Sequence, residues 1–468
     1  MNPGVNHLLL STALLGTFFS GTATRIVAIS MPTVASSLGT DLIGISWALL
    51  AYQISNIALS IIFGRVSDLW GREKVFGLGF VVFSLSSLLC GLSSNVMQLI
   101  LSRFLQGVGR SMLQSSSRAL AAESVPEALA GRAQGYMTTA HHLGFVLGPS
   151  IGGLMIDYFT WRWSFFLLVP IGLCGALLTL ASLSRRSPVP QHPNVSIDYL
   201  GATLLVATTT LLVLIFDRRT HKILGANMRI VLGLILAGCF AALIIHESKT
   251  QSPFVNLSLF RIRRFAFSVV SLLIIAMCYS LIGFLMPFYL QDILDLSATA
   301  VGVLFMVPSI LTVAFAPLSG SMSDRFGPRT PATLGAAIMV LALGVGGLLK
   351  TDSHWLLPAL LIVLSAITNG IFNPANSTAM IGLMPSEHRG FASSMNHVTF
   401  GVGNVLGIAM GSFVMAAAFE HYTGLAGVSP TTDNPQGFVA AVNVTFVAAT
   451  VLSFGAVAAS VARGNGSR

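Results

Sequence analysis

The sequence predicts an all-α membrane protein that crosses the bilayer many times. Of its 468 residues, 54% are hydrophobic and only 9% are charged, with a mean hydropathy of +0.81, whereas soluble domains carry about 25% charged residues. A membrane-spanning helix needs about 20 mostly apolar residues. Fourteen segments meet this requirement, at 8–31, 43–63, 75–93, 96–117, 134–156, 163–183, 199–216, 229–246, 265–290, 298–318, 331–349, 355–380, 391–418 and 437–461.

A short motif that occurs twice indicates two related halves. Gly64-Arg-Val-Ser-Asp68-Leu-Trp-Gly71 follows the second apolar segment, and Gly320-Ser-Met-Ser-Asp324-Arg-Phe-Gly327 follows the tenth. Six spans with short loops would separate the copies by about 200 residues. The larger observed separation matches one extra helix pair, at 199–216 and 229–246. We therefore predict a six-helix bundle over 1–183, an inserted helix pair with its linkers over 184–264, and a second six-helix bundle over 265–468.

The charges predict the orientation of the chain. The net charge is +9, but no basic run with interleaved aromatic residues suggests a nucleic-acid partner. If both termini are cytoplasmic, the inner loops and tail hold fifteen Arg and Lys residues, Arg463 among them, and the outer loops hold six. Because basic residues gather on the cytoplasmic side, we expect a multi-pass protein of a bacterial cell membrane with both ends inside.

Several motifs resemble those of the major facilitator superfamily, in particular its fourteen-span drug:proton antiporters. They are the first hinge motif, Arg103-Phe-Leu-Gln106-Gly107 in the fourth span, the glycine-rich run from Gly144 to Gly153 in the fifth span, and Trp161-Arg-Trp163 before the sixth. The resemblance implies two six-helix bundles plus two inserted helices. It also implies proton-coupled efflux of bulky amphipathic or hydrophobic compounds, of the multidrug type, by alternating access.

Other classes of function can be weighed against proton-coupled export. No ATP-binding lysine motif, metal cluster or catalytic triad is visible, so we expect no enzyme activity, no cofactor and no metal. We expect a monomer that lies in the lipid bilayer and binds protons and a small-molecule or lipid-like substrate. Proton-coupled uptake by symport is the main rival to export.

Two sets of residues are predicted to control the conformation. The resemblance implies a latch at the hinges that locks and releases as the cavity opens, whereas the plainer alternative is a tight loop with solvated charges. Small residues four positions apart share a helix face and allow close helix contact, and the resemblance implies that the fifth-span residues favour exchange over leak. The latch residues are Gly64, Asp68, Gly71, Arg72, Asp324 and Arg329, and the antiporter-motif residues are Gly144, Gly148, Pro149, Gly152 and Gly153.

The substrate and proton pathway is predicted from polar residues inside the spans. Arg103, Gln106, Arg110 and Gln114 lie on one face of the fourth span, and the resemblance implies proton coupling or substrate binding for Arg103, against a structural tie to backbone carbonyls. Aromatic and amide side chains elsewhere suit a cavity for bulky amphipathic molecules. The remaining pathway candidates are Arg25, Tyr52, Gln53, His141, His142, Phe284, Tyr289, Asn373, Asn396 and His397.

The first span departs from the family pattern, because Ala23 stands where an acid is usual and Arg25 follows it. No Asp or Glu lies in the middle of any predicted span. The arginines therefore lack an obvious counter-charge, which favours an anionic or lipid-like substrate as an alternative. The sequence does not decide which residue carries the proton. The candidates are the three histidines named above, Asp68 and Asp157. For each histidine, the alternative is a neutral, hydrogen-bonded side chain without a role in proton transfer.

Overall fold

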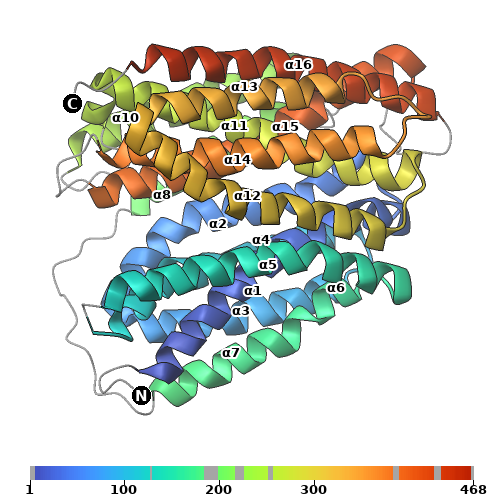
Figure 1. The fold of residues 1–468 in the computed structure, drawn as a ribbon. Helices are drawn as coiled ribbons and strands as arrows, with labels where there is room; N and C mark the ends of the chain where they lie inside the picture. The colour runs from blue at the N-terminus through green and yellow to red at the C-terminus, as the bar shows by residue number, and fades with distance from the viewer. Residues whose placement is uncertain are drawn as a thin grey trace. The chain divides into compact units, whose positions relative to one another are not determined.

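The computed structural model describes residues 6–126, 129–183, 199–216, 226–250, 257–382, 389–425 and 434–464, and within these ranges it contains helices and no β-strand (Figure 1). Each of the fourteen predicted segments falls on a helix, the sixth being shared by α6 and α7. The helices are α1 His7–Ser37, α2 Leu42–Trp70, α3 Arg72–Leu92, α4 Val96–Glu123, α5 Ala130–Tyr158, α6 Trp163–Phe166, α7 Leu168–Leu183, α8 Tyr199–Phe216, α10 Ala226–Lys249, α11 Arg263–Phe288, α12 Ala298–Phe326, α13 Arg329–Gly346, α14 Leu356–Gly382, α15 Arg389–Thr423 and α16 Pro435–Ala462, with a 3₁₀ turn η2 at Leu257–Arg261 and a π-helical turn η3 at Tyr289–Ile293.

Eleven stretches of the described helices are long and apolar enough to cross a membrane. Helices α4 and α5 are not among them, because they carry arginine and histidine side chains within their length. Such polar helices normally face the interior of a membrane bundle or a cavity. In agreement, α4 packs along α3, and α5 packs along α1. The prediction of a polytopic all-α protein is confirmed, and the count of fourteen spans stays a prediction.

The chain forms two compact units. The first comprises Met1–Thr40, Trp47–Val206 and Ser297–Met306, and the second comprises Asp41–Ser46, Ala207–Leu296 and Val307–Arg468. In the first unit α3 lies between α4 and α7, and α1 runs beside α5 (Figure 1). In the second unit α13 packs on α14 and α16, and α11 packs on α15. The predicted division at residues 183 and 264 is a different partition and stays a prediction.

Several helices begin at residues whose side chains cap the backbone. Asn6, Asn95 and Asn434 each accept a hydrogen bond from the amide three residues later, at 3.1, 2.9 and 2.9 Å. Asp41 accepts one from the Gly44 amide at 2.8 Å before α2. These caps satisfy amides that the first helical turn leaves without an intrahelical partner. The polar residue at each of these starts is therefore a local signal for where the helix begins.

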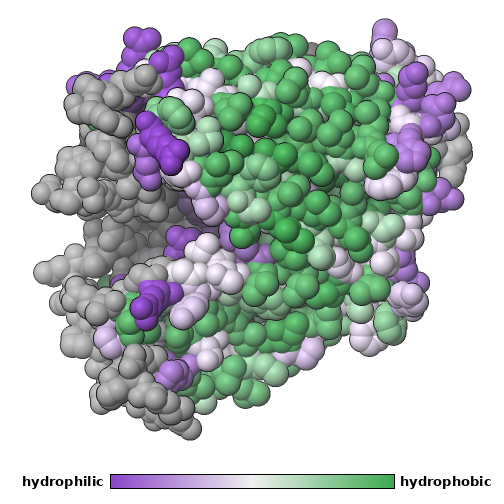
Figure 2. Space-filling view, in the orientation of Figure 1, coloured by the Kyte–Doolittle hydropathy of each residue, from purple (hydrophilic) through white to green (hydrophobic). Residues whose placement is uncertain are grey.

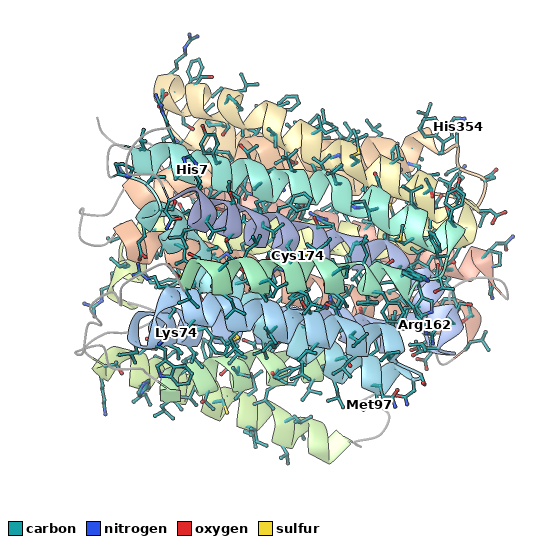
Figure 3. All side chains as sticks on the ribbon, turned by 90° about the horizontal axis from the view of Figure 1, so that it is seen from below. His7, Lys74, Met97, Arg162, Cys174 and His354 are labelled. Atoms are coloured by element: carbon teal, nitrogen blue, oxygen red, sulfur yellow. The ribbon has the colours of Figure 1, made fainter. Side chains whose placement is uncertain are left out.

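The surface distribution fits a bilayer environment. Apolar side chains cover the middle of the helices, and hydrophilic ones gather near their ends (Figure 2). Helix α10 is the extreme case, since only 11% of its apolar stretch Ile230–Lys249 is buried, against 78% of Leu42–Ser60 in α2. In the first unit, Figure 3 places His7 and Lys74 at one end of the helices and Met97 and Arg162 at the other. The helices of this unit therefore alternate in direction across one membrane-length layer.

Candidate functional site

The centre of the candidate site in the first unit is a buried arginine packed on a tyrosine. Arg103 on α4 is 1% exposed, and its guanidinium carbon lies 3.9 Å from the centroid of the Tyr52 ring on α2. Its Nε donates to the Ala48 carbonyl at 3.2 Å, and its Nη1 donates to the Gln106 side chain. Gln106 in turn donates to Ser87 Oγ on α3 at 2.7 Å. Arg103 thus ties three helices together through a backbone carbonyl, an amide and a ring face.

A second arginine meets the same tyrosine. Arg110 is 7% exposed, its Nη1 donates to the Tyr52 hydroxyl at 3.1 Å, and its guanidinium carbon lies 5.2 Å from the ring centroid. The two guanidinium carbons are therefore no more than about 9 Å apart, where two like charges repel by about 2 kcal/mol at an effective dielectric constant of 20. Within the described part of the chain, the buried Nε of Arg110 has no hydrogen-bond partner. The site therefore retains an unused donor beside an uncompensated positive charge.

An aromatic side chain joins the predicted residues of α1 and α5. The guanidinium carbon of Arg25 lies 4.8 Å from the centroid of the Phe145 ring. His141 lies 4.6 Å from the same ring and 6.0 Å from His142, measured between centroids. Arg25 and both histidines are half-buried, as are the predicted Gln53 and Gln114. The structure thus brings Arg25 and His141 together, as it does Arg103, Gln106, Arg110 and Tyr52.

The glycines of α5 make backbone contact with α1. A Cβ atom added at Gly144, Gly148 or Gly152 would lie 2.3, 2.9 or 2.6 Å from a carbonyl oxygen of α1, closer than real Cβ atoms approach. Only glycine therefore permits this spacing between the two helices. The predicted close packing is present, and its specific role in exchange stays a prediction.

The same helix also contacts the first turns of α12, which belong to the first unit. A Cβ at Gly153 would lie 2.3 Å from the Ala298 carbonyl, and one at Gly302 would lie 2.4 Å from the Pro149 carbonyl. Asp157 accepts hydrogen bonds from the Ala298 and Thr299 amides at 3.2 and 2.8 Å. Asp157, a sequence candidate for the proton carrier, therefore serves as the cap of α12.

The two hinge motifs share a backbone conformation. Gly71 has φ +99° and Gly327 has φ +77°, the left-handed region that favours glycine. Arg72 forms an ion pair with Glu123 at the end of α4, a partner that the sequence analysis does not identify. Asp324 is exposed and Arg329 is half-buried, and no described atom lies within 4 Å of a Cβ added at Gly64. The side chain of Asp68 lies outside the described part of the structure, so the latch stays a prediction.

Among the described residues, the hydrogen bonds and ring contacts of the second unit do not join its predicted site residues into one cluster. Asn373 donates to Asn369 one turn earlier on α14, and Asn396 donates to Ser377 Oγ at 2.5 Å. Phe284 packs edge-on against Phe288, with ring centroids 5.7 Å apart. The Tyr289 hydroxyl donates to the Lys350 carbonyl at 2.5 Å, which ties the end of α11 to the loop before α14. The side chain of His397 is exposed.

One arginine of the second unit is placed differently from the expectation. Arg463, which the sequence analysis counts among the basic residues of the cytoplasmic loops and tail, is only 4% exposed. Its Nη1 donates to Asn376 Oδ1 at 2.8 Å and to Ser268 Oγ at 3.1 Å, and its Nη2 donates to the Pro328 carbonyl at 3.2 Å. Burial, followed by the nearby charge of Arg329, lowers the pKa of Arg463 to about 10, so the side chain still carries its charge at neutral pH. It joins α16, α14 and α11 to the second hinge.

The sequence profile of the Major Facilitator Superfamily matches residues 13–407, and again 268–462. The chain belongs to the Major Facilitator Superfamily. Within this superfamily it is similar to the riboflavin transporter RibZ of Clostridioides difficile, with 29% identity over 88% of this chain and 89% of the relative. It is also similar to the multidrug transporter protein MdtP of Bacillus subtilis, with 26% identity over 88% of this chain and 75% of the relative. The protein is therefore a multi-pass membrane transporter, not an enzyme.

Solved structures of the superfamily show the same fold. A bacterial homologue of the human lysosomal transporter Spinster, in an inward-facing and occupied conformation, matches with a TM-score of 0.72 and 14% identity, over 99% of this chain and 97% of that one. This match confirms the prediction of the superfamily fold.

Proposed function

We propose that the protein is a proton-coupled antiporter that exports bulky amphipathic or hydrophobic compounds by alternating access. The proposal includes fourteen spans in the drug:proton antiporter arrangement, two six-helix bundles separated by an inserted pair, and both termini in the cytoplasm. Relatives named as multidrug transporters support it, among them MdtP and the putative multidrug resistance protein MdtD of Salmonella heidelberg, 28% identical over 85% of both chains.

The observation that carries the proposal is the backbone contact between α5 and α1. Glycines at 144, 148 and 152 bring the two helices together without intervening side chains. Packing of this kind excludes water, so it opposes a leak of ions alongside α1. The same two helices carry Arg25, Phe145 and His141, and the Phe145 ring contacts the other two side chains. The close α1–α5 packing therefore lies next to residues suited to binding a substrate. A sealed pathway beside a polar site favours obligatory exchange over free diffusion.

The chemistry of the first unit suits molecules with aromatic surface and polar ends. The rings of Tyr52 and Phe145 both lie against guanidinium groups. Such sites bind flat or bulky apolar groups through ring faces and fix them through a few donors. We include the hinge residues in the proposal as the conformational latch, because Gly71 and Gly327 share a left-handed turn.

The test is transport by purified protein in liposomes under an imposed pH gradient. Ethidium, riboflavin and fluorescein serve as cationic, neutral and anionic probes. If the protein is an antiporter, protons leave the acidic compartment while probe enters it. The probe should therefore accumulate in the acidic compartment as the pH gradient declines. Movement of probe in the same direction as the protons would instead identify a symporter. Probe movement that is independent of the gradient would contradict proton coupling.

A second candidate function is export of an anionic or lipid-like substrate. It is favoured by the Arg103–Tyr52–Arg110 cluster, since no described carboxylate contacts either guanidinium. An anionic group near Arg110 would use its free Nε donor and offset the repulsion between the arginines. Arg110→Gln should therefore weaken transport of fluorescein more than that of ethidium. Arg118→Gln on the exposed part of α4 is the matched control, and equal effects of Arg110→Gln on both probes would contradict the anion hypothesis.

A further inference from the structure

We propose that Asp292, in the π-helical turn η3 at the end of α11, is a proton-binding carboxylate of the transport cycle. This inference rests on the proposed proton coupling and names a residue for it. Asp292 lies two residues beyond the predicted span and was not among the sequence candidates.

The surroundings of Asp292 offer its charge little compensation. The residue is the last but one of the membrane-length stretch Arg263–Ile293, and its side chain is half-buried. Its Oδ2 is inaccessible to solvent and has no hydrogen-bond partner among the described residues. A carboxylate oxygen that is buried without a hydrogen-bond donor raises the free-energy cost of the charged form. Binding a proton removes that cost, which is the requirement for a reversible proton site.

The turn itself is held together without the carboxylate. The Leu294 amide donates to the Tyr289 carbonyl at 3.1 Å, and the Leu296 amide donates to the Leu290 carbonyl at 3.0 Å. Asp295 closes the turn with φ +52°, a left-handed conformation that aspartate tolerates better than most residues. π-helical turns are rare and occur frequently at functional sites. Since the fold of this turn uses backbone bonds, the Asp292 side chain is available for another task.

The charged and titratable groups near the turn do not neutralise Asp292. Tyr289 lies in the same turn, and its hydroxyl is bonded to the Lys350 carbonyl. The loop reached in this way carries Lys350 and Asp352, whose side chains are exposed, and Asp295 is exposed as well. No described cation forms an ion pair with Asp292. By contrast, both carboxylate oxygens of Asp157 accept amide hydrogen bonds.

The proposed step is a simple protonation. An O–H bond forms between Asp292 and a proton from one compartment, and the same bond breaks when the proton leaves to the other. In the proposed orientation, η3 lies at the outer end of α11, where protons enter a bacterial cell. Asparagine imitates the protonated side chain but cannot release a proton. Asp292→Asn should therefore uncouple transport from the gradient without removing the substrate site.

The experiment compares Asp292→Asn with Asp295→Asn, three residues away on the same segment, in liposomes containing the probe that the wild-type protein transports fastest. The expected result is a loss of gradient-driven accumulation by about tenfold or more in Asp292→Asn, with exchange of labelled for unlabelled probe at equal pH unchanged. Asp295→Asn should match the wild type in both assays. Full gradient-driven transport by Asp292→Asn, or loss of exchange as well, would overturn the inference.

A measurement on the wild-type protein covers the case in which Asp292→Asn does not fold. Dicyclohexylcarbodiimide reacts with protonated carboxyl groups in apolar surroundings, and mass spectrometry locates the adduct. Labelling of Asp292 that rises as the pH falls and is absent at Asp295 supports the inference, and no labelling of Asp292 overturns it. If the wild-type protein ignores the pH gradient, the proposed proton coupling fails together with this role. Gradient-driven transport that persists in Asp292→Asn removes only the role of Asp292.

Discussion

Replacing Arg463 by alanine tests whether the buried network of the second unit holds the fold as its geometry indicates. The side chain makes three hydrogen bonds, to Asn376, Ser268 and the Pro328 carbonyl. Hydrogen bonds to charged groups contribute about 1.5–3 kcal/mol each, and the recovered hydration of the arginine offsets part of that sum. Ser271 also still donates to Asn376 Oδ1 at 3.4 Å. We therefore expect Arg463→Ala to cost about 3 kcal/mol of unfolding free energy.

The assay is thermal unfolding of the detergent-solubilised protein followed by size-exclusion chromatography. A loss of that size lowers Tm by about 3 °C if all 468 residues unfold together. Arg463→Lys should lie between the wild type and Arg463→Ala, because one ammonium group cannot reach three acceptors in the geometry of a guanidinium. A chain that ends after Gly464 should keep the wild-type Tm, and one that ends after Ala462 should not. A Tm for Arg463→Ala within about 1 °C of wild type would refute the reasoning.

Three further predictions concern the first unit. Gly144→Ala should force α5 away from α1, costing about 1–3 kcal/mol and adding a proton leak in liposomes, whereas Gly135→Ala on the same helix, with nothing described within 4 Å, should do neither. Gly71→Ala should lower the unfolding free energy by about 1–2 kcal/mol, because alanine is strained at positive φ. Thermal unfolding should show no such loss for Gly64→Ala, since no described atom lies within 4 Å of a Cβ at that position. Tyr52→Phe keeps the ring but removes the hydroxyl that accepts from α4, so we expect a loss of about 1 kcal/mol in thermal unfolding and weaker binding of fluorescein in equilibrium dialysis.

Most of the fold could be predicted because the bilayer restricts the possibilities. Backbone polar groups in lipid must be satisfied within a helix, so each apolar stretch of about 20 residues implied a helix. The repeated hinge motif predicted two related halves, and both copies adopt a left-handed conformation at their second glycine. The cluster on α4 followed from helical periodicity, which placed Arg103, Gln106 and Arg110 on one face. The tyrosine that Arg103 and Arg110 share lies on another helix, and the sequence analysis named it only as one of the remaining pathway candidates.

The residues that sequence reasoning missed depend on contacts between distant segments. Arg463 follows the last apolar stretch, where a basic residue usually marks a cytoplasmic tail, but its acceptors come from three other parts of the chain. Glu123 pairs with Arg72 across 51 positions. Asp292 follows the predicted apolar span by two positions, so its sequence position alone did not distinguish it from a solvated loop residue. The structure places it in a π-helical turn with one carboxylate oxygen buried.

The two hinges have the same backbone form but unequal attachments, which bears on how a latch could work. In the first unit, Arg72 and Glu123 form an ion pair whose side chains are 37% and 31% exposed. Pairs of this kind contribute about 0–1 kcal/mol and weaken with salt. In the second unit, Arg463 reaches the Pro328 carbonyl at the hinge from an almost fully buried position. Removing its interactions costs several times more, by the estimate above. Because a latch must be broken and remade in every cycle, the weakly held first hinge suits the part of the proposed latch that opens, and the second hinge suits the part that stays fixed.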